Sequence, residues 1–276
     1  MITSEKTSRY QFPPSTQTWR INKEIALLIG GGRALLMQIA HPMVAQGVAD
    51  HSDFRERPLD RLFRTLFSII QIVFAEREVA QQVAARVRTV HRSVTGEMGE
   101  TVGSLEQKRR YFAENPVLLM WVFATLVDTS IVIYELLFQP LSDAEKEQFY
   151  LESCIWGGWL GVSADVLPPD YPAFCSYLQS MADTGQLAVG VAGRDICESI
   201  FRPNIRWIPN IALAPVKFLT IGMLPKSLRP AFGFDWSERQ EKRFRRIISI
   251  FRWLLRFTPE RMRSLPMAWK IRRETR

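Results

Sequence analysis

The chain has 276 residues, 47% of them hydrophobic and 23% charged, which is enough to bury a core and excludes the composition of a disordered protein. Its formal net charge is +8, but residues 238–276 alone hold 13 Lys/Arg and 4 Asp/Glu, whereas the rest of the chain holds 23 and 24. The basic character therefore belongs to one end. Since the remainder is nearly neutral and contains no nucleic-acid-binding motif, nucleic acid is not a predicted partner.

The cysteines and the N-terminus bear on the cellular compartment. Cys154, Cys175 and Cys197 are widely spaced and form no CxxC pair, which predicts neither a disulfide framework nor a zinc knuckle. The first 20 residues contain no apolar run typical of a signal peptide. We therefore expect a cytoplasmic protein, with peripheral membrane contact as an alternative for its basic end.

Long stretches of the sequence follow a helical period, and no Asn-Gly or Asp-Gly hairpin separates alternating runs. This predicts an all-α fold, in which an N-terminal arm (1–20) precedes one domain (21–276) of roughly ten helices. Gly30 to Gly32 should break the first helical stretch, and Pro42 should kink or interrupt the next. The helical segments that follow are expected at 58–75, 76–94, 104–113, 117–138, 141–163, 168–185, 188–203 and 238–257.

The segment 117–138 is long and apolar enough to be mistaken for a membrane span. Asp128 lies near its middle and Glu135 near its end. A charged side chain at the centre of a span costs a few kcal/mol in lipid. We therefore interpret the segment as a buried helix of a large helical core.

The segment 58–75 carries three polar residues that could serve a ligand. Arg61 and Thr65 are four residues apart and share a side of the helix, with Arg64 beside them. Arginine binds carboxylates through two parallel hydrogen bonds and stays charged. The alternative is a solvated polar face with intrahelical pairs such as Asp60–Arg64. The opposing apolar stripe is Leu62, Leu66, Ile69, Ile70 and Val73.

The chain contains only three histidines. His91 flanks the apolar side of the segment 76–94, where it is either a ligand or a hydrogen-bonded core residue. His41 precedes Pro42 and a run of small residues, which would allow close packing against a flat ligand or another helix. His51 begins a polar turn and is interpreted as a cap or loop residue.

This set of residues restricts the kind of metal site. There is no HExxH, no Glu-x-x-His pair and no Cys/His cluster, so zinc hydrolases and di-iron bundles lack their ligands. Haem needs only one axial imidazole from the protein, because the porphyrin supplies four nitrogens. Its propionates need cationic partners, which Arg61 and Arg64 could supply.

In these segments the chain resembles the catalytic domain shared by the bacterial rubber oxygenase (latex clearing protein) and the fungal MpaB-type oxygenases. The likeness extends from about Ile25 to Pro266. It is carried by the stretches "LLMQIAHPMVAQGVADHS", "RLFRTLFSIIQIVFAE", "VRTVHRSVTG", "NPVLLMWVFATLVDTSIVIYE" and "LGVSADVLP", in this order and at these separations. The resemblance implies a globin-like all-α fold, a haem b (iron protoporphyrin IX) and oxidative cleavage of carbon–carbon double bonds with O2.

The resemblance also implies roles for individual residues. The proximal haem ligand maps to His91, and an arginine and a threonine near the haem map to Arg61 and Thr65. The rubber oxygenase has a lysine at the position of Arg64, where it can act as a distal axial ligand. Arginine does not readily lose its proton, so this resting state is not expected here. A second departure is Phe123, where many relatives have histidine.

We therefore expect a haem-dependent oxygenase of the dioxygenase type, with His91 binding the iron and Arg61, Arg64, Thr65 and His41 around the cofactor. Its substrate should be a hydrophobic unsaturated molecule, such as a polyprenoid. One alternative is a non-catalytic haem sensor or carrier. Another is a helical protein without haem that associates with membranes through the basic amphipathic segment 238–257, which otherwise packs on the domain.

Overall fold

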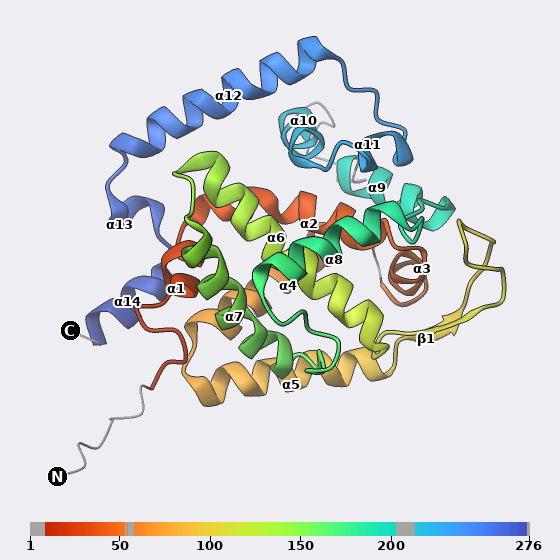
Figure 1. Cartoon of the computed structure of the whole chain (residues 1–276), viewed down its shortest axis with the longest axis horizontal. Coiled ribbons are helices and arrows are strands. Elements are labelled where there is room, and N and C mark those ends of the chain that lie inside the picture. The colour runs from red at the N-terminus through yellow and green to blue at the C-terminus, as the bar shows by residue number, and fades with distance from the viewer. Residues whose placement is uncertain (1–8, 53, 55–57, 203–212, 275–276) are drawn as a thin grey trace.

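The computed structural model describes residues 9–52, 54, 58–202 and 213–274, without the side chains of residues 58–62. It confirms the all-α prediction, because helices account for all but one small sheet among the described elements (Figure 1). Helices outnumber the predicted ten because several are only one or two turns long. In chain order they are α1 (Gln17–Asn22), the 3-10 helix η1 (Ile25–Gly30), α2 (Gly31–Ile39), α3 (Pro42–His51), α4 (Pro58–Phe74), α5 (Arg77–Arg92), α6 (Pro116–Leu137), α7 (Asp143–Trp159), α8 (Tyr171–Asp183), α9 (Val191–Phe201), α10 (Ala214–Met223), α11 (Leu228–Ala231), α12 (Glu238–Phe257), α13 (Glu260–Arg263) and α14 (Pro266–Glu274).

Helix α6 runs through the centre of the molecule, and η1, α2, α7 and α12 pack against it (Figure 1). Asn115 caps its N-terminus by accepting a hydrogen bond from the backbone N–H of Val117, and Pro116 occupies the first turn. Among the described helices, α6 is the one whose length and composition would allow it to cross a membrane, and 61% of its apolar window is buried by other parts of the chain. The helical segments 25–39 and 42–51, which are separated by a sharp bend, are long and apolar enough to cross a membrane only if they are counted together as one span.

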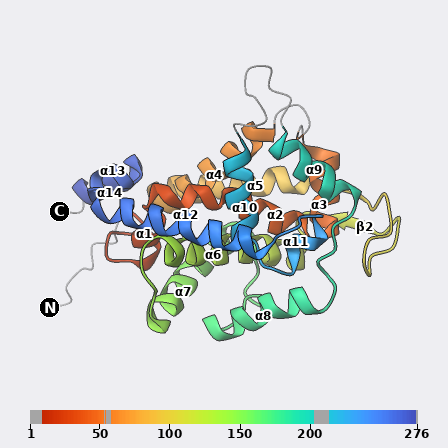
Figure 2. The same ribbon diagram turned by 90° about the horizontal axis from the view of Figure 1, so that it is seen from above.

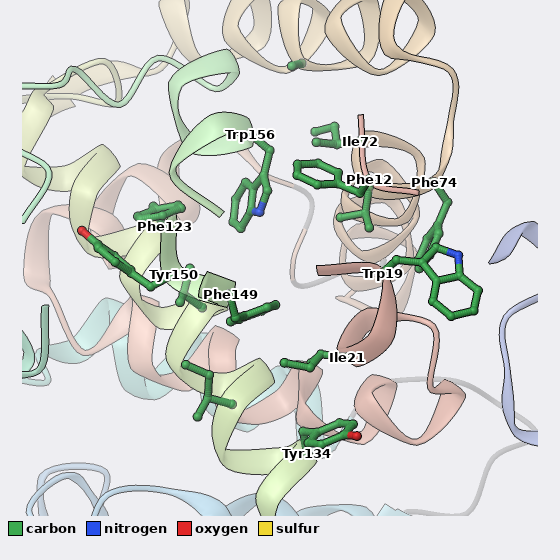
Figure 3. Packing of buried hydrophobic residues seen from close by; sticks show 14 of the residues in the cluster. Phe12, Trp19, Ile21, Ile72, Phe74, Phe123, Tyr134, Phe149, Tyr150 and Trp156 are labelled. Atoms are coloured by element: carbon green, nitrogen blue, oxygen red, sulfur yellow. The ribbon is translucent and has the colours of Figure 1, made fainter. Parts of the chain in front are cut away.

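The largest apolar cluster lies between α6, α7 and the first residues of the chain (Figure 3). Phe123 meets Trp156 edge to face, with ring centroids 4.9 Å apart. A Cβ on Gly157 would lie 2.8 Å from the Phe123 ring, so only glycine permits this approach. Phe12 is also buried in this cluster, ahead of α1. Residues before the predicted boundary at 20 thus contribute to the core.

A buried ionic network joins α2, α6 and α10. The Arg33 guanidinium donates to Asp128 (2.7 Å), to the Thr129 hydroxyl (2.6 Å) and, through Nε, to the backbone carbonyl of Met223 (2.9 Å). The Arg33 side chain is only 4% exposed. The network explains the charge within the apolar helix α6, because Asp128 pairs with Arg33 inside the protein.

The chain bends sharply between α2 and α3, by 107°. Pro42 stands in the first turn of α3, which confirms that it interrupts the helical stretch. His41, at the bend, is buried, and burial lowers its pKa from 6.5 to about 4. Its Nδ1 has no hydrogen-bond partner among the described residues. The His41 ring is therefore neutral at pH 7.

The predicted helix at 104–113 is wrong. Residues Thr95–Glu97 (β1) and Arg110–Phe112 (β2) instead form an antiparallel two-stranded sheet, with Gly96 opposite Tyr111. The Tyr111 ring packs over Gly96, where a Cβ would lie 2.5 Å from its hydroxyl, and that hydroxyl donates to Asp50 at 2.5 Å. Because these partners are distant in sequence, the local helical pattern was not decisive.

Replacing Arg33 with methionine should lower the free energy of unfolding by about 3 kcal/mol, because Asp128 would lose its charged partner in the interior. Urea denaturation followed by far-ultraviolet circular dichroism measures this change. The double variant Arg33→Met/Asp128→Leu removes both charges and should recover at least half of the loss. A change below about 1 kcal/mol in the single variant would contradict a stabilising role for the network.

The depressed pKa of His41 makes stability depend on pH. Below pH 6.5 the unfolded chain binds a proton at His41 that the folded chain does not bind until about pH 4, so the free energy of unfolding falls as the pH falls through this window. The expected loss is roughly 3 kcal/mol. Denaturation of wild type and His41→Phe between pH 7 and 4 should show this component only in wild type. His51→Phe serves as the exposed control, and equal slopes for wild type and His41→Phe would refute the assignment.

Candidate functional site

The helices α4 and α5 carry most of the predicted site residues. They are joined by the two residues Ala75 and Glu76 and pack against each other. Arg61 lies 14 residues before Ala75 and His91 lies 15 residues after Glu76. At 1.5 Å per residue, both positions are therefore about equally far from the turn along their helices. Arg61 and His91 thus each lie at the end of their helix that is remote from the turn.

His91 lies in the last turn of α5 and is half-buried. Ala80, Val83 and Ala84 form the buried side of this helix, while Val90, next to His91, is 63% exposed. The ring thus stands at the edge of the core and not deep within it. Its Nδ1 atom is buried, although the residue as a whole is partly exposed.

On α4, Arg64 and Thr65 both have substantial exposure. The neighbouring Phe63 and Phe67 are also exposed, which is unusual for large aromatic side chains on a well-packed helix. The side chains of Asp60 and Arg61 lie outside the described residues. The predicted role of Arg61 and the alternative Asp60–Arg64 pair therefore remain predictions.

A small cavity is lined by Thr65 and Leu66 of α4. Its volume is about 40 Å³, and among the described residues its polar lining residues are Thr65 and Gln38. Helices α2, α4, α6 and α9 contribute to it. The remaining lining residues are Gly31, Ala34, Leu35, Phe54, Leu66, Leu126, Ile196 and Ile200. The cavity has room for a few water molecules or one small apolar group, and a porphyrin does not fit in it.

The other two histidines lie at the two ends of α3. His41 is one helical turn beyond Gln38, at the bend after α2, and does not line the cavity. His51 ends α3 and is exposed, with Nε2 at 2.9 Å from the Thr95 carbonyl and its ring edge-to-face with Tyr111. The interpretation of His51 as a cap or loop residue is one position off, because His51 is the last residue of α3 and Ser52 is its C-cap.

Phe123, the second departure from the resemblance, is a core residue in this structure. It is buried against Trp156 and Gly157 and does not line the cavity (Figure 3). Gln38 and the α9 residues of the cavity were not among the site residues predicted from the sequence. Apolar residues such as Ile196 and Ile200 carry no sequence signal that separates a cavity wall from ordinary core.

The described residues contain no group of three or more His, Cys, Asp or Glu side chains that could hold a metal ion. A site built from His91 would thus use one protein ligand. The candidate site offers the imidazole of His91 at the boundary of the core, and the guanidinium of Arg64 and the hydroxyl of Thr65 on the neighbouring helix, in apolar surroundings. This set fits a largely apolar cofactor with an anionic edge that brings most of its own metal ligands.

Comparisons with known proteins bear on this site. A family model described as the catalytic domain of ER-bound oxygenase mpaB/B' and rubber oxygenase matches residues 18–253. An uncharacterised protein of Mycobacterium tuberculosis and one of Mycobacterium bovis are each 27% identical to the chain over 234 residues, covering 82% of this chain and 88% of theirs. No solved structure shows significant similarity. The family model spans α1 to α12, including every helix of the candidate site, and the chain therefore belongs to the family of mpaB/rubber oxygenase catalytic domains.

Proposed function

We propose that the protein is a haem b-dependent oxygenase that uses O2 to cleave or oxygenate a hydrophobic unsaturated substrate. The observation that carries the proposal is the position of His91. It stands half-buried at the edge of the core, on a helix packed against the one that bears Arg61, Arg64 and Thr65, in a chain of an oxygenase family. When bound, the haem would supply the iron at which dioxygen is activated.

The residues of the site have separate tasks in this proposal. His91 would hold the cofactor through its imidazole, and the guanidinium groups of Arg61 and Arg64 would bind the propionates. As an arginine, Arg64 would serve as a cation and not as a metal ligand. The exposed Phe63 and Val90 offer apolar surface for the cofactor to cover.

The cavity beside α4 favours an apolar substrate. Thr65 can donate a hydrogen bond from its hydroxyl, and Gln38 is the other polar group, while all further lining residues are apolar. At about 40 Å³ the cavity would admit one small apolar group of a larger hydrophobic substrate. A small polar substrate would leave its own hydrogen bonds unsatisfied there.

A non-catalytic haem sensor or carrier is the second candidate. Arg64 favours it, since the lysine implied for the rubber oxygenase is absent at this position. Phe123 adds less weight, because its ring fills the core and does not line the cavity. Oxygen consumption with an unsaturated substrate separates the two functions.

Purified wild type reconstituted with haem should show a Soret band that the His91→Ala variant loses, because the axial ligand is removed. His51→Ala is the matched control, and it should retain the band. Far-ultraviolet circular dichroism should remain helical in all three proteins. A Soret band of equal position and intensity in His91→Ala would contradict the proposed ligation.

Thr65→Val keeps the shape of the side chain and removes its hydroxyl. Haem content should be unchanged, while the rate of oxygen uptake with a polyprenoid or unsaturated lipid should fall by about tenfold or more, as expected for the loss of a hydrogen bond made during the reaction. An oxygen electrode measures the rate. Thr89→Val, a substitution on the exposed side of α5, is the control. An unchanged rate would exclude the hydroxyl from the reaction.

A further inference from the structure

Helix α12 carries two apolar stripes on different sides. The first consists of Phe244, Ile248 and Leu255 and packs on α6 and α10. Phe244 packs so closely over Gly222 of α10 that a Cβ there would lie 2.3 Å from the ring. This close packing agrees with the predicted docking of 238–257 on the domain.

The second stripe consists of Ile250, Trp253, Leu254 and Phe257, at spacings of three and four residues, and it faces away from the body. These side chains are between 48% and 67% exposed. Figure 1 shows α12 along one edge of the molecule, with α6 and α10 to one side of it, and Figure 2 shows the same helix from above, lying across the body. Met262 of α13, which follows α12 in the chain, is 72% exposed.

The same outward side is cationic in the first half of the helix. Arg239, Lys242, Arg243 and Arg246 precede Ile250 at the same spacing. Arg239, Lys242 and Arg246 are exposed and form no ion pair with any described residue. The helix as a whole has seven basic and two acidic residues. A row of available cations therefore continues directly into a row of aromatic and aliphatic side chains.

A groove beside the second half of α12 strengthens this positive field. Its volume is about 810 Å³, and its lining includes five basic residues and one acidic residue, Glu24. Three of the basic residues pair with carboxylates: Arg20 with Glu145, Lys23 with Glu260 and Arg263 with Glu24. The other two, Arg252 and Arg256, lie on α12 and have no carboxylate partner among the described residues.

We propose that the outward face of α12 binds the surface of an anionic lipid bilayer, with Trp253 and Phe257 inserted among the lipids and Arg239, Lys242 and Arg246 on the headgroup phosphates. Aromatic side chains beside arginines are the pattern of helices that lie in a membrane interface. Basic residues near an anionic surface each strengthen binding. Pairing of this face with a second copy would bring two helices of like charge together, which is unfavourable. This inference does not depend on haem binding.

Co-sedimentation of the full chain with vesicles tests the proposal. The protein should bind vesicles of phosphatidylcholine with 30% phosphatidylglycerol, and pure phosphatidylcholine or 0.5 M salt should lower the partition coefficient at least about tenfold. Trp253→Ala/Phe257→Ala should lower it by about tenfold or more. Arg239→Gln/Lys242→Gln/Arg246→Gln should lower it by about 100-fold and abolish the preference for the anionic lipid.

Matched controls remove similar groups elsewhere. Leu151→Ala/Ile155→Ala deletes two exposed apolar side chains from α7, and Lys108→Gln/Arg109→Gln/Arg110→Gln removes three exposed charges from the β1–β2 hairpin. Both should bind like wild type. Equal loss in the control and α12 variants, or binding that is indifferent to lipid charge, overturns the proposal. So does a wild-type dimer in sedimentation velocity that Trp253→Ala/Phe257→Ala converts to monomer, since the occupant would then be a second copy.

Discussion

The hydrogen-bonded ion pair between Arg33 and Asp128 sets the arrangement on which the rest of the structure depends. One guanidinium binds the carboxylate and a hydroxyl of α6 and the last carbonyl of α10, and so it fixes α2 against both helices. Other residues of α2 line the cavity beside α4, and its end carries the bend at His41. Helix α10 in turn supports α12 through Gly222. The cavity and the basic C-terminal helix thus share one buried polar anchor.

The candidate site follows from the length of two consecutive helices. Because α4 and α5 have nearly equal lengths on either side of a two-residue connection, Arg61 and His91 lie at similar distances from that connection along their helices. The imidazole of His91 stands where the core meets the surface, and the polar residues of α4 occupy the neighbouring helix. The chain belongs to an oxygenase family, and the proposed cofactor site at this end of α5 is consistent with that membership.

Much of the helical framework could be predicted from the sequence, because periodicity and caps are local. The predicted segment 58–75 is one residue longer than α4 at its C-terminal end, and 117–138 is shifted by one residue from α6. The capping box of Ser142 and Glu145 is present at the start of α7. The prediction of a helix at 104–113 is wrong because the contact of Tyr111 with Gly96 outweighs a short helical pattern. The position of His91 at the edge of the apolar stripe was predictable from its spacing to Val87.

The Arg33–Asp128 pair and the cavity wall from α9 could not be predicted from the sequence, since they join residues about a hundred or more positions apart. Nor could the sequence separate the two stripes of α12, which differ only in what packs on them.

Chemical rescue at His91 tests the proposed cofactor site most directly. A His91→Gly variant leaves a space where the imidazole stood, and the full chain should bind haem weakly, with a Soret spectrum unlike that of wild type. Added imidazole should restore the wild-type spectrum in a saturable manner, while it leaves His51→Gly unchanged. Two results would contradict the iron–histidine bond proposed at the end of α5. One is a wild-type spectrum of His91→Gly without imidazole, and the other is a failure of both wild type and His91→Gly to take up haem.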